Sequence, residues 1–130
     1  MSNIHELSLL LPATVESARN ARRAVDAMPF DKHDEALFNL RLLITELVGN
    51  SVRHAGLTSA DTIVLEIQIR SDQIRAQVTD HGPGFTRPVF DDPPNGAGGR
   101  GLYLVDALAD RWGVSRTPGG EARVWFEIDI

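Results

Sequence analysis

The chain has 130 residues, a formal net charge of −5 and no cysteine, and 42% of its residues are hydrophobic. This length suits one domain with one core, which we expect to span residues 1–130. The acidic balance argues against direct nucleic-acid binding, which requires phosphate neutralisation. No apolar run approaches the roughly 20 residues that span a bilayer, and residues 1–7 lack the basic stretch of a secretory signal. We therefore expect a cytoplasmic protein with no membrane association and no disulfide.

The first part of the chain predicts one strand followed by two helices. The strand covers residues 6–11 and stops at Pro12. The first helix runs from a Thr14 cap to about Met28. The second, longer helix covers about residues 31–55 and is capped by Asp31. The residues expected to face the core are Val15, Ala18, Ala21, Val25, Met28, Leu37, Leu40, Ile44, Leu47 and Val48.

The second part of the chain predicts two hairpins separated by a loop and a helix. Strict alternation of apolar and polar residues indicates strands with one buried face. The expected elements are strands over 62–70, 74–80, 112–116 and 123–130, a Gly- and Pro-rich loop over 81–101, and a helix over 102–109. Together the elements predict a two-layer α/β sandwich, in which helices cover one face of a mixed, antiparallel-rich sheet.

Three polar residues of the second helix fall on one face, because Glu46, Asn50 and His54 are spaced by four. A carboxylate and an amide in line suit Mg²⁺, which takes oxygen ligands. Glu46 could also serve as a base that orients a hydroxyl or a water. The alternative is an ordinary solvent-exposed polar face, which is the normal outside of a helix.

The next candidate is Asp80, which ends a predicted strand and is followed by Gly82 and Gly84. A carboxylate there can accept a hydrogen bond from an exocyclic amine such as that of adenine. The two glycines allow the backbone to approach a flat ring closely. The alternative is a simple turn, in which Asp-x-Gly is common.

A cluster of glycines precedes the third predicted helix: Gly96, Gly98, Gly99 and Gly101. Free main-chain amides at a helix N-terminus, together with the helix dipole, bind anions such as phosphate. Arg100 could add a charged contact. A flexible loop is the alternative. The chain has no Gly-Lys-Ser/Thr unit, which excludes a P-loop.

In this order the three segments resemble the GHKL (Bergerat-fold) ATPase superfamily. Residues 43–55 look like its N box, residues 80–84 like its G1 box and residues 99–102 like its G2 box. Within the superfamily the chain is most similar to the bacterial anti-sigma factor serine/threonine kinases. The likeness extends over nearly the whole chain.

The resemblance implies a role for each matching residue. Glu46 would be the catalytic base for the acceptor hydroxyl, Asn50 would coordinate Mg²⁺ at the ATP phosphates, and Asp80 would bind the adenine amine. Arg19 would contact a sigma factor, and a homodimer is expected. The other nucleotide-binding residues would be Gly82, Gly84, Gly99, Arg100, Gly101 and Leu102.

Two departures from the family pattern leave the function open. Residues 120–123 lack the Thr that relatives often carry near the adenine, and no Arg precedes the glycines of the lid; neither Arg87 nor Arg100 matches that position. The leading hypothesis is an ATP-binding anti-sigma regulator that phosphorylates a Ser or Thr on an antagonist protein. The alternatives are an ATP-dependent binding module without kinase activity and a detached histidine-kinase catalytic domain.

Overall fold

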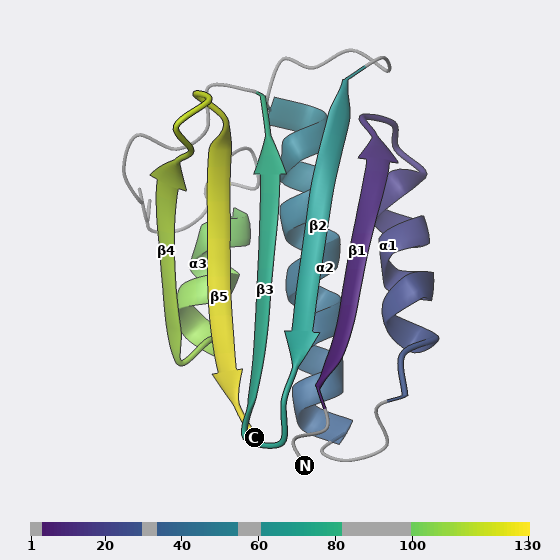
Figure 1. Ribbon diagram of the computed structural model, residues 1–130, viewed down its shortest axis with the longest axis vertical. Coiled ribbons are helices and arrows are strands. Elements are labelled where there is room, and N and C mark those ends of the chain that lie inside the picture. Colours follow the sequence, from purple (N-terminus) through teal and green to yellow (C-terminus); the bar gives the residue numbers. More distant parts are fainter. Residues whose placement is uncertain (1–3, 30–33, 55–60, 82–99) are drawn as a thin grey trace.

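The computed structural model describes residues 4–29, 34–54, 61–81 and 100–130. These residues form five strands and three helices in the order predicted from the sequence (Figure 1). The elements are β1 (His5–Pro12), α1 (Ser17–Asp26), α2 (Asp34–His54), β2 (Thr62–Ile69), β3 (Gln73–Asp80), α3 (Arg100–Leu108), β4 (Arg111–Arg116) and β5 (Ala122–Asp129).

The strands form one sheet in the order β1-β2-β3-β5-β4, and each of these pairings is antiparallel. The three helices lie on the same face of this sheet, with α2 behind its centre (Figure 1). The predicted two-layer α/β sandwich is therefore confirmed. Its register pairs Asp80, the last residue of β3, with Ala122, the first residue of β5.

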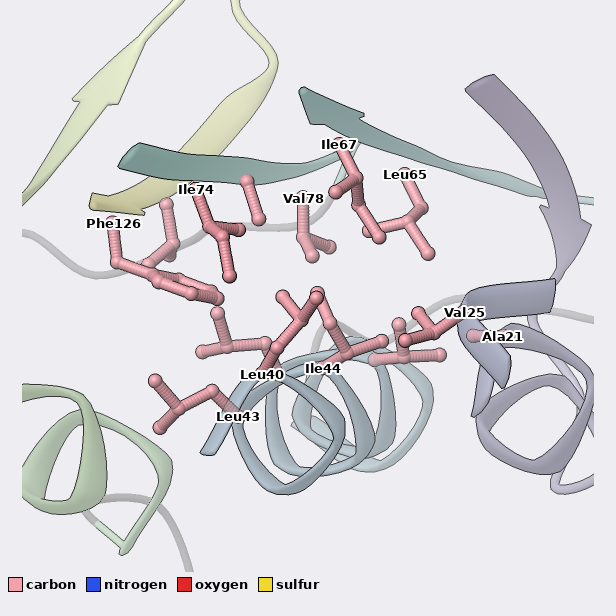
Figure 2. Packing of buried hydrophobic residues seen from close by; sticks show 14 of the residues in the cluster. Ala21, Val25, Leu40, Leu43, Ile44, Leu65, Ile67, Ile74, Val78 and Phe126 are labelled. Atoms are coloured by element: carbon pink, nitrogen blue, oxygen red, sulfur yellow. The ribbon is translucent and has the colours of Figure 1, made fainter. Parts of the chain in front are cut away.

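The inner strands β2, β3 and β5 bury every second residue, with Thr79 of β3 as an additional buried position, which is the period of a sheet with one covered face. Ile63, Leu65, Ile67 and Ile69 of β2 are all buried, as the alternation in the sequence predicts. The central strand β3 continues the pattern, and its inward residues point toward α2 (Figure 2). Those residues are Ile74, Ala76, Val78 and, at the end of the strand, Asp80.

The helix α2 supplies the other side of the core. Its predicted inward residues Leu40, Ile44, Leu47 and Val48 are buried, whereas Leu37 is only partly buried. Leu43, which the predicted stripe omits, is also buried and lies on the side of α2 that faces α3 (Figure 2). The apolar surface of α2 is wider than predicted because the helix packs against α1 and α3 as well as the sheet.

The start of α1 differs from the prediction. The helix begins at Ser17, and Thr14 lies in a turn in which its N–H donates to Pro12 O over 2.8 Å. The Ser17 hydroxyl also donates to Pro12 O, which holds the helix start against the end of β1. Val15 is consequently 79% exposed rather than buried. The buried residues of α1 are Ser17, Ala21 and Val25.

The burial pattern of α2 gives a direct test of this packing. Leu40 is fully buried, while Phe38, two residues earlier on the same helix, is 63% exposed. We expect Leu40→Ala to lower the free energy of unfolding by about 2–5 kcal/mol, because it removes apolar contacts and leaves a cavity. Phe38→Ala should change it by no more than about 0.5 kcal/mol. Urea denaturation followed by circular dichroism measures both; similar losses would contradict the assigned orientation of α2.

Candidate functional site

The candidate site lies where the C-terminal part of α2 meets the end of β3. Asn50 is 5% exposed and Asp80 is 8% exposed. Asp80 points toward α2 because it follows the same alternation as the inward residues of β3. The two elements are joined by a buried hydrogen bond, in which the Ser51 hydroxyl donates to Asp80 Oδ2 over 2.6 Å. The structure therefore places the turn of α2 that carries Asn50 and Ser51 beside the predicted strand-end acid, and the contact itself is made by Ser51.

The burial of Asn50 rules out an ordinary solvent-exposed face at this position. Among the residues that the structure describes, Asn50 Nδ2 is buried and has no hydrogen-bond partner. A buried polar atom without a partner is costly, by about 1–3 kcal/mol. Glu46 is half-buried and lies one turn earlier on the helix, about 6 Å along its axis. The amide of Asn50 thus offers unused hydrogen-bonding capacity beside a carboxylate.

The oxygen of the Asn50 amide accepts a hydrogen bond from Arg53. Its Nη2 donates to Asn50 Oδ1 over 3.0 Å, and the Arg53 residue is otherwise exposed. The guanidinium lies across Gly49, because a Cβ at that position would be 2.9 Å from Arg53 Nη1. Gly49 therefore leaves the room that Arg53 uses to reach Asn50. No role was predicted for Arg53 from the sequence.

Ser51 is the residue that the sequence motifs missed. It lies seven residues after Ile44 and three after Val48, so it continues the buried stripe of α2. A polar residue in that stripe must find a partner inside the protein. Its spacing from Ile44 and Val48 is therefore the sequence pattern that could have identified Ser51. The residue paired with Asp80 across the sheet is Ala122, which has no hydroxyl. The hydroxyl beside the carboxylate therefore comes from the helix.

His81 and Glu121 flank the same end of the sheet. His81 follows Asp80 and is exposed, and its Nε2 lies 3.5 Å from Glu121 Oε2. Glu121 immediately precedes β5. This contact ties the segment after β3 to the β4–β5 turn.

Several predicted residues lie outside the part of the chain that the structure describes, namely Gly82, Gly84, Arg87, Gly96, Gly98 and Gly99. The helix α3 begins at Arg100, two residues earlier than predicted, and Gly101 is in its first turn. The side chain of Leu102 is fully buried in the core. Its main-chain N–H, also in the first turn, is therefore the group that could reach an anion.

Arg19 stands apart from this site. It is exposed on α1, at the opposite side of the molecule from α3 (Figure 1). Its exposure agrees with its predicted position off the buried stripe of α1. Within residues 4–29, 34–54, 61–81 and 100–130, no three His, Asp or Glu residues cluster as a metal site would require. No helix in these ranges is long and apolar enough to span a bilayer.

The antiparallel sheet with helices on one face forms a two-layer α/β sandwich. The model of the histidine kinase-like ATPase domain matches residues 11–126. The chain belongs to this family, and the family membership predicted from the three motifs is confirmed.

Curated relatives and a solved structure extend the comparison. The chain is 31% identical over 143 residues to the sensor histidine kinase AruS of Pseudomonas aeruginosa, and the match covers 95% of the chain but 14% of AruS. It is 29% identical over 125 residues to the serine-protein kinase RsbW of Listeria innocua, covering 85% of the chain and 80% of RsbW. The crystal structure of the RsbU and RsbW domains of Rv1364c from Mycobacterium tuberculosis has the same fold, with a TM-score of 0.69 at 19% identity; the match covers 95% of this chain and 31% of that one.

The contact between Gly49 and Arg53 yields a stability prediction. Gly49→Ala should raise the free energy of unfolding by up to about 1 kcal/mol, because Ala is the better helix former and the only group displaced is a mobile guanidinium. Gly113→Ala is the matched control. A Cβ there would lie 2.8 Å from Trp125 Nε1 and 3.0 Å from Cε2, atoms of a rigid ring, so stability should fall. Thermal unfolding of the two variants distinguishes them, and a loss of stability in Gly49→Ala would show that Arg53 cannot move aside.

Proposed function

We propose that this chain binds Mg·ATP at the α2–β3 site and uses it in an anti-sigma regulatory switch, phosphorylating a Ser or Thr on an antagonist protein. The observation that carries the proposal is the burial of Asn50 and Asp80 where Ser51, the neighbour of Asn50, donates to Asp80, within a histidine kinase-like ATPase domain. The serine-protein kinase RsbW of Listeria innocua, which matches over most of its own length, supports the choice of acceptor.

The proposed division of labour follows from the chemistry of each side chain. The Asn50 amide oxygen is an uncharged oxygen ligand for Mg²⁺; it accepts one hydrogen bond from Arg53 and has a second lone pair for a metal. The metal, when bound, neutralises charge on the ATP phosphates. Asp80, whose Oδ2 already accepts from Ser51, has acceptor capacity left on its carboxylate that suits the adenine amine. Main-chain amides at the start of α3 suit the phosphates. The phosphate-binding residues would be Gly99, Arg100, Gly101 and Leu102. Gly82 and Gly84 would lie beside the adenine ring.

Glu46 is proposed as the base for the transfer step. It shares a helix face with Asn50, one turn away, and it is only half-buried. A carboxylate in that place can hold the acceptor hydroxyl and take its proton as the phosphoryl group is transferred. We further propose that residues 1–130 act as one domain in the cytoplasm and that this domain forms a homodimer. Arg19 is proposed to contact a sigma factor.

A second candidate is a histidine-kinase catalytic domain, which the similarity to AruS favours. A third candidate is an ATP-dependent binding module without kinase activity. It is favoured by the two departures from the family pattern, the missing Thr in residues 120–123 and the missing Arg before the lid glycines. Incubation with labelled ATP, Mg²⁺ and candidate antagonist proteins separates the three. Acid-stable label on a partner indicates a Ser or Thr acceptor, acid-labile label indicates His, and ATP binding without transfer indicates a binding module.

The transfer step gives a prediction at Glu46. Glu46→Gln keeps the shape of the side chain and removes the base, so phosphorylation should slow at least about a hundredfold. The affinity for ATP should stay near that of the wild type, because Asn50 and Asp80 are untouched. Asn50→Ala, in contrast, should weaken both Mg·ATP binding and transfer. Unchanged phosphorylation by Glu46→Gln in a rapid-mixing assay would exclude Glu46 as the base.

A further prediction concerns Arg19, which is exposed on α1. If Arg19 contacts a sigma factor, Arg19→Ala should weaken that complex while leaving ATP affinity unchanged. Because surface substitutions rarely alter stability by more than about 0.5 kcal/mol, the melting temperature should also hold. Arg23→Ala, an exposed arginine of the same helix, is the control. Equal sigma-factor binding by the wild type and Arg19→Ala, measured by calorimetry, would remove this role.

A further inference from the structure

We infer that Ser51 is a positioning residue that makes the site selective for adenine over bases with a carbonyl at the same ring position. The inference rests on the proposed function, since it deepens the role given to Asp80. It is carried by the 2.6 Å hydrogen bond from the Ser51 hydroxyl to Asp80 Oδ2. Ser51 acts through the carboxylate and not by contact with the nucleotide.

The position of Ser51 fixes the direction of this hydrogen bond. Ser51 is 7% exposed and sits in the buried stripe of α2, so its side chain is held between the core and the strand end. An ionised carboxylate only accepts hydrogen bonds, so the hydroxyl must donate. The donor therefore fixes one oxygen of Asp80 and, with it, the plane of the carboxylate.

The residue paired with Asp80 on the neighbouring strand cannot replace the hydroxyl of Ser51 as a donor. Asp80 terminates β3 and pairs with Ala122, whose methyl group offers no hydrogen bond to the carboxylate. The hydroxyl from α2 thus supplies side-chain support that the paired position on the sheet cannot. Hydrogen bonds to charged groups are stronger than those between neutral groups, so the loss of this one would weaken the hold on the orientation of the carboxylate.

A fixed carboxylate discriminates between bases by hydrogen-bond chemistry. The exocyclic amine of adenine donates to it, whereas the carbonyl of hypoxanthine presents a second acceptor and is repelled. A site built to pair with one polar group rejects an analogue that leaves that group unpaired. If Asp80 loses its orientation, the preference for ADP over IDP should shrink.

The test measures the affinities of ADP and IDP for the full chain by isothermal titration calorimetry. For Ser51→Ala we expect ADP affinity to fall about tenfold with little change for IDP, so that the preference for ADP falls about tenfold. Ser51→Thr keeps the hydroxyl and should restore the preference. Ser51→Cys has a weaker donor of similar size and should give an intermediate value; it provides the measurement if Ser51→Ala does not fold.

Ser17→Ala is the matched control. Ser17 is also buried and also donates its hydroxyl to a protein oxygen, that of Pro12, but it lies on α1. Its loss should lower the melting temperature and leave the ADP-to-IDP ratio unchanged. A purely structural role for Ser51 predicts the same behaviour.

The outcomes separate this inference from the proposed function. If the wild type does not bind ADP, the proposed function fails and this inference fails with it. If Asp80→Asn weakens ADP but Ser51→Ala preserves the wild-type ratio, the role of Ser51 is overturned and the nucleotide site stands. An equal loss of ADP and IDP in Ser51→Ala also overturns the positioning role.

Discussion

The packing of α2 against the sheet is the interaction on which the other features depend. Its side chains meet the inward rows of β2, β3 and β5, and α1 and α3 pack beside it (Figure 2). Leu47 and Val48 anchor the turn that immediately precedes Asn50 and Ser51. Because well-packed cores do not deform continuously, the contacts that stabilise the fold also set where these polar groups lie relative to Asp80.

Much of the fold could be predicted from the sequence because its strongest patterns are local. The alternation from Ile63 to Ile69 identifies a strand with one buried face, and the spacing of Leu40, Ile44 and Leu47 identifies the inward side of a helix. The start of α1 could not be predicted in this way. Thr14 is a good cap by residue type, but the Ser17 hydroxyl bonds to Pro12 O, and the N-cap is Glu16, two residues later.

The site was predictable only as far as its local patterns reach. Spacing places Glu46 and Asn50 on one helix face, but it does not say that Asn50 is buried. That burial arises from tertiary packing, in which the neighbouring Ser51 bonds to Asp80 of β3, later in the chain. The role of Ser51 depends on Asp80, 29 residues away, and the reach of Arg53 depends on the missing side chain of Gly49. Such contacts arise from tertiary packing, so residue types alone do not specify them.

The antiparallel order of the strands has a consequence for how this domain can be attached to others. The first described strand begins beside the end of β2, where His5 pairs with Ile69, and Ile130 N donates to Asp72 O in the β2–β3 turn. Both described ends therefore lie at the end of the sheet where β3 begins, opposite Asp80 (Figure 1). The length of β3, from Gln73 to Asp80, separates them from Asp80 by about 24 Å. A neighbouring domain tethered at either point would be attached at the end of the sheet away from Asp80. The related sequence makes up 14% of AruS and the related fold 31% of the Rv1364c chain, and this geometry suits a module that is carried within much longer polypeptides.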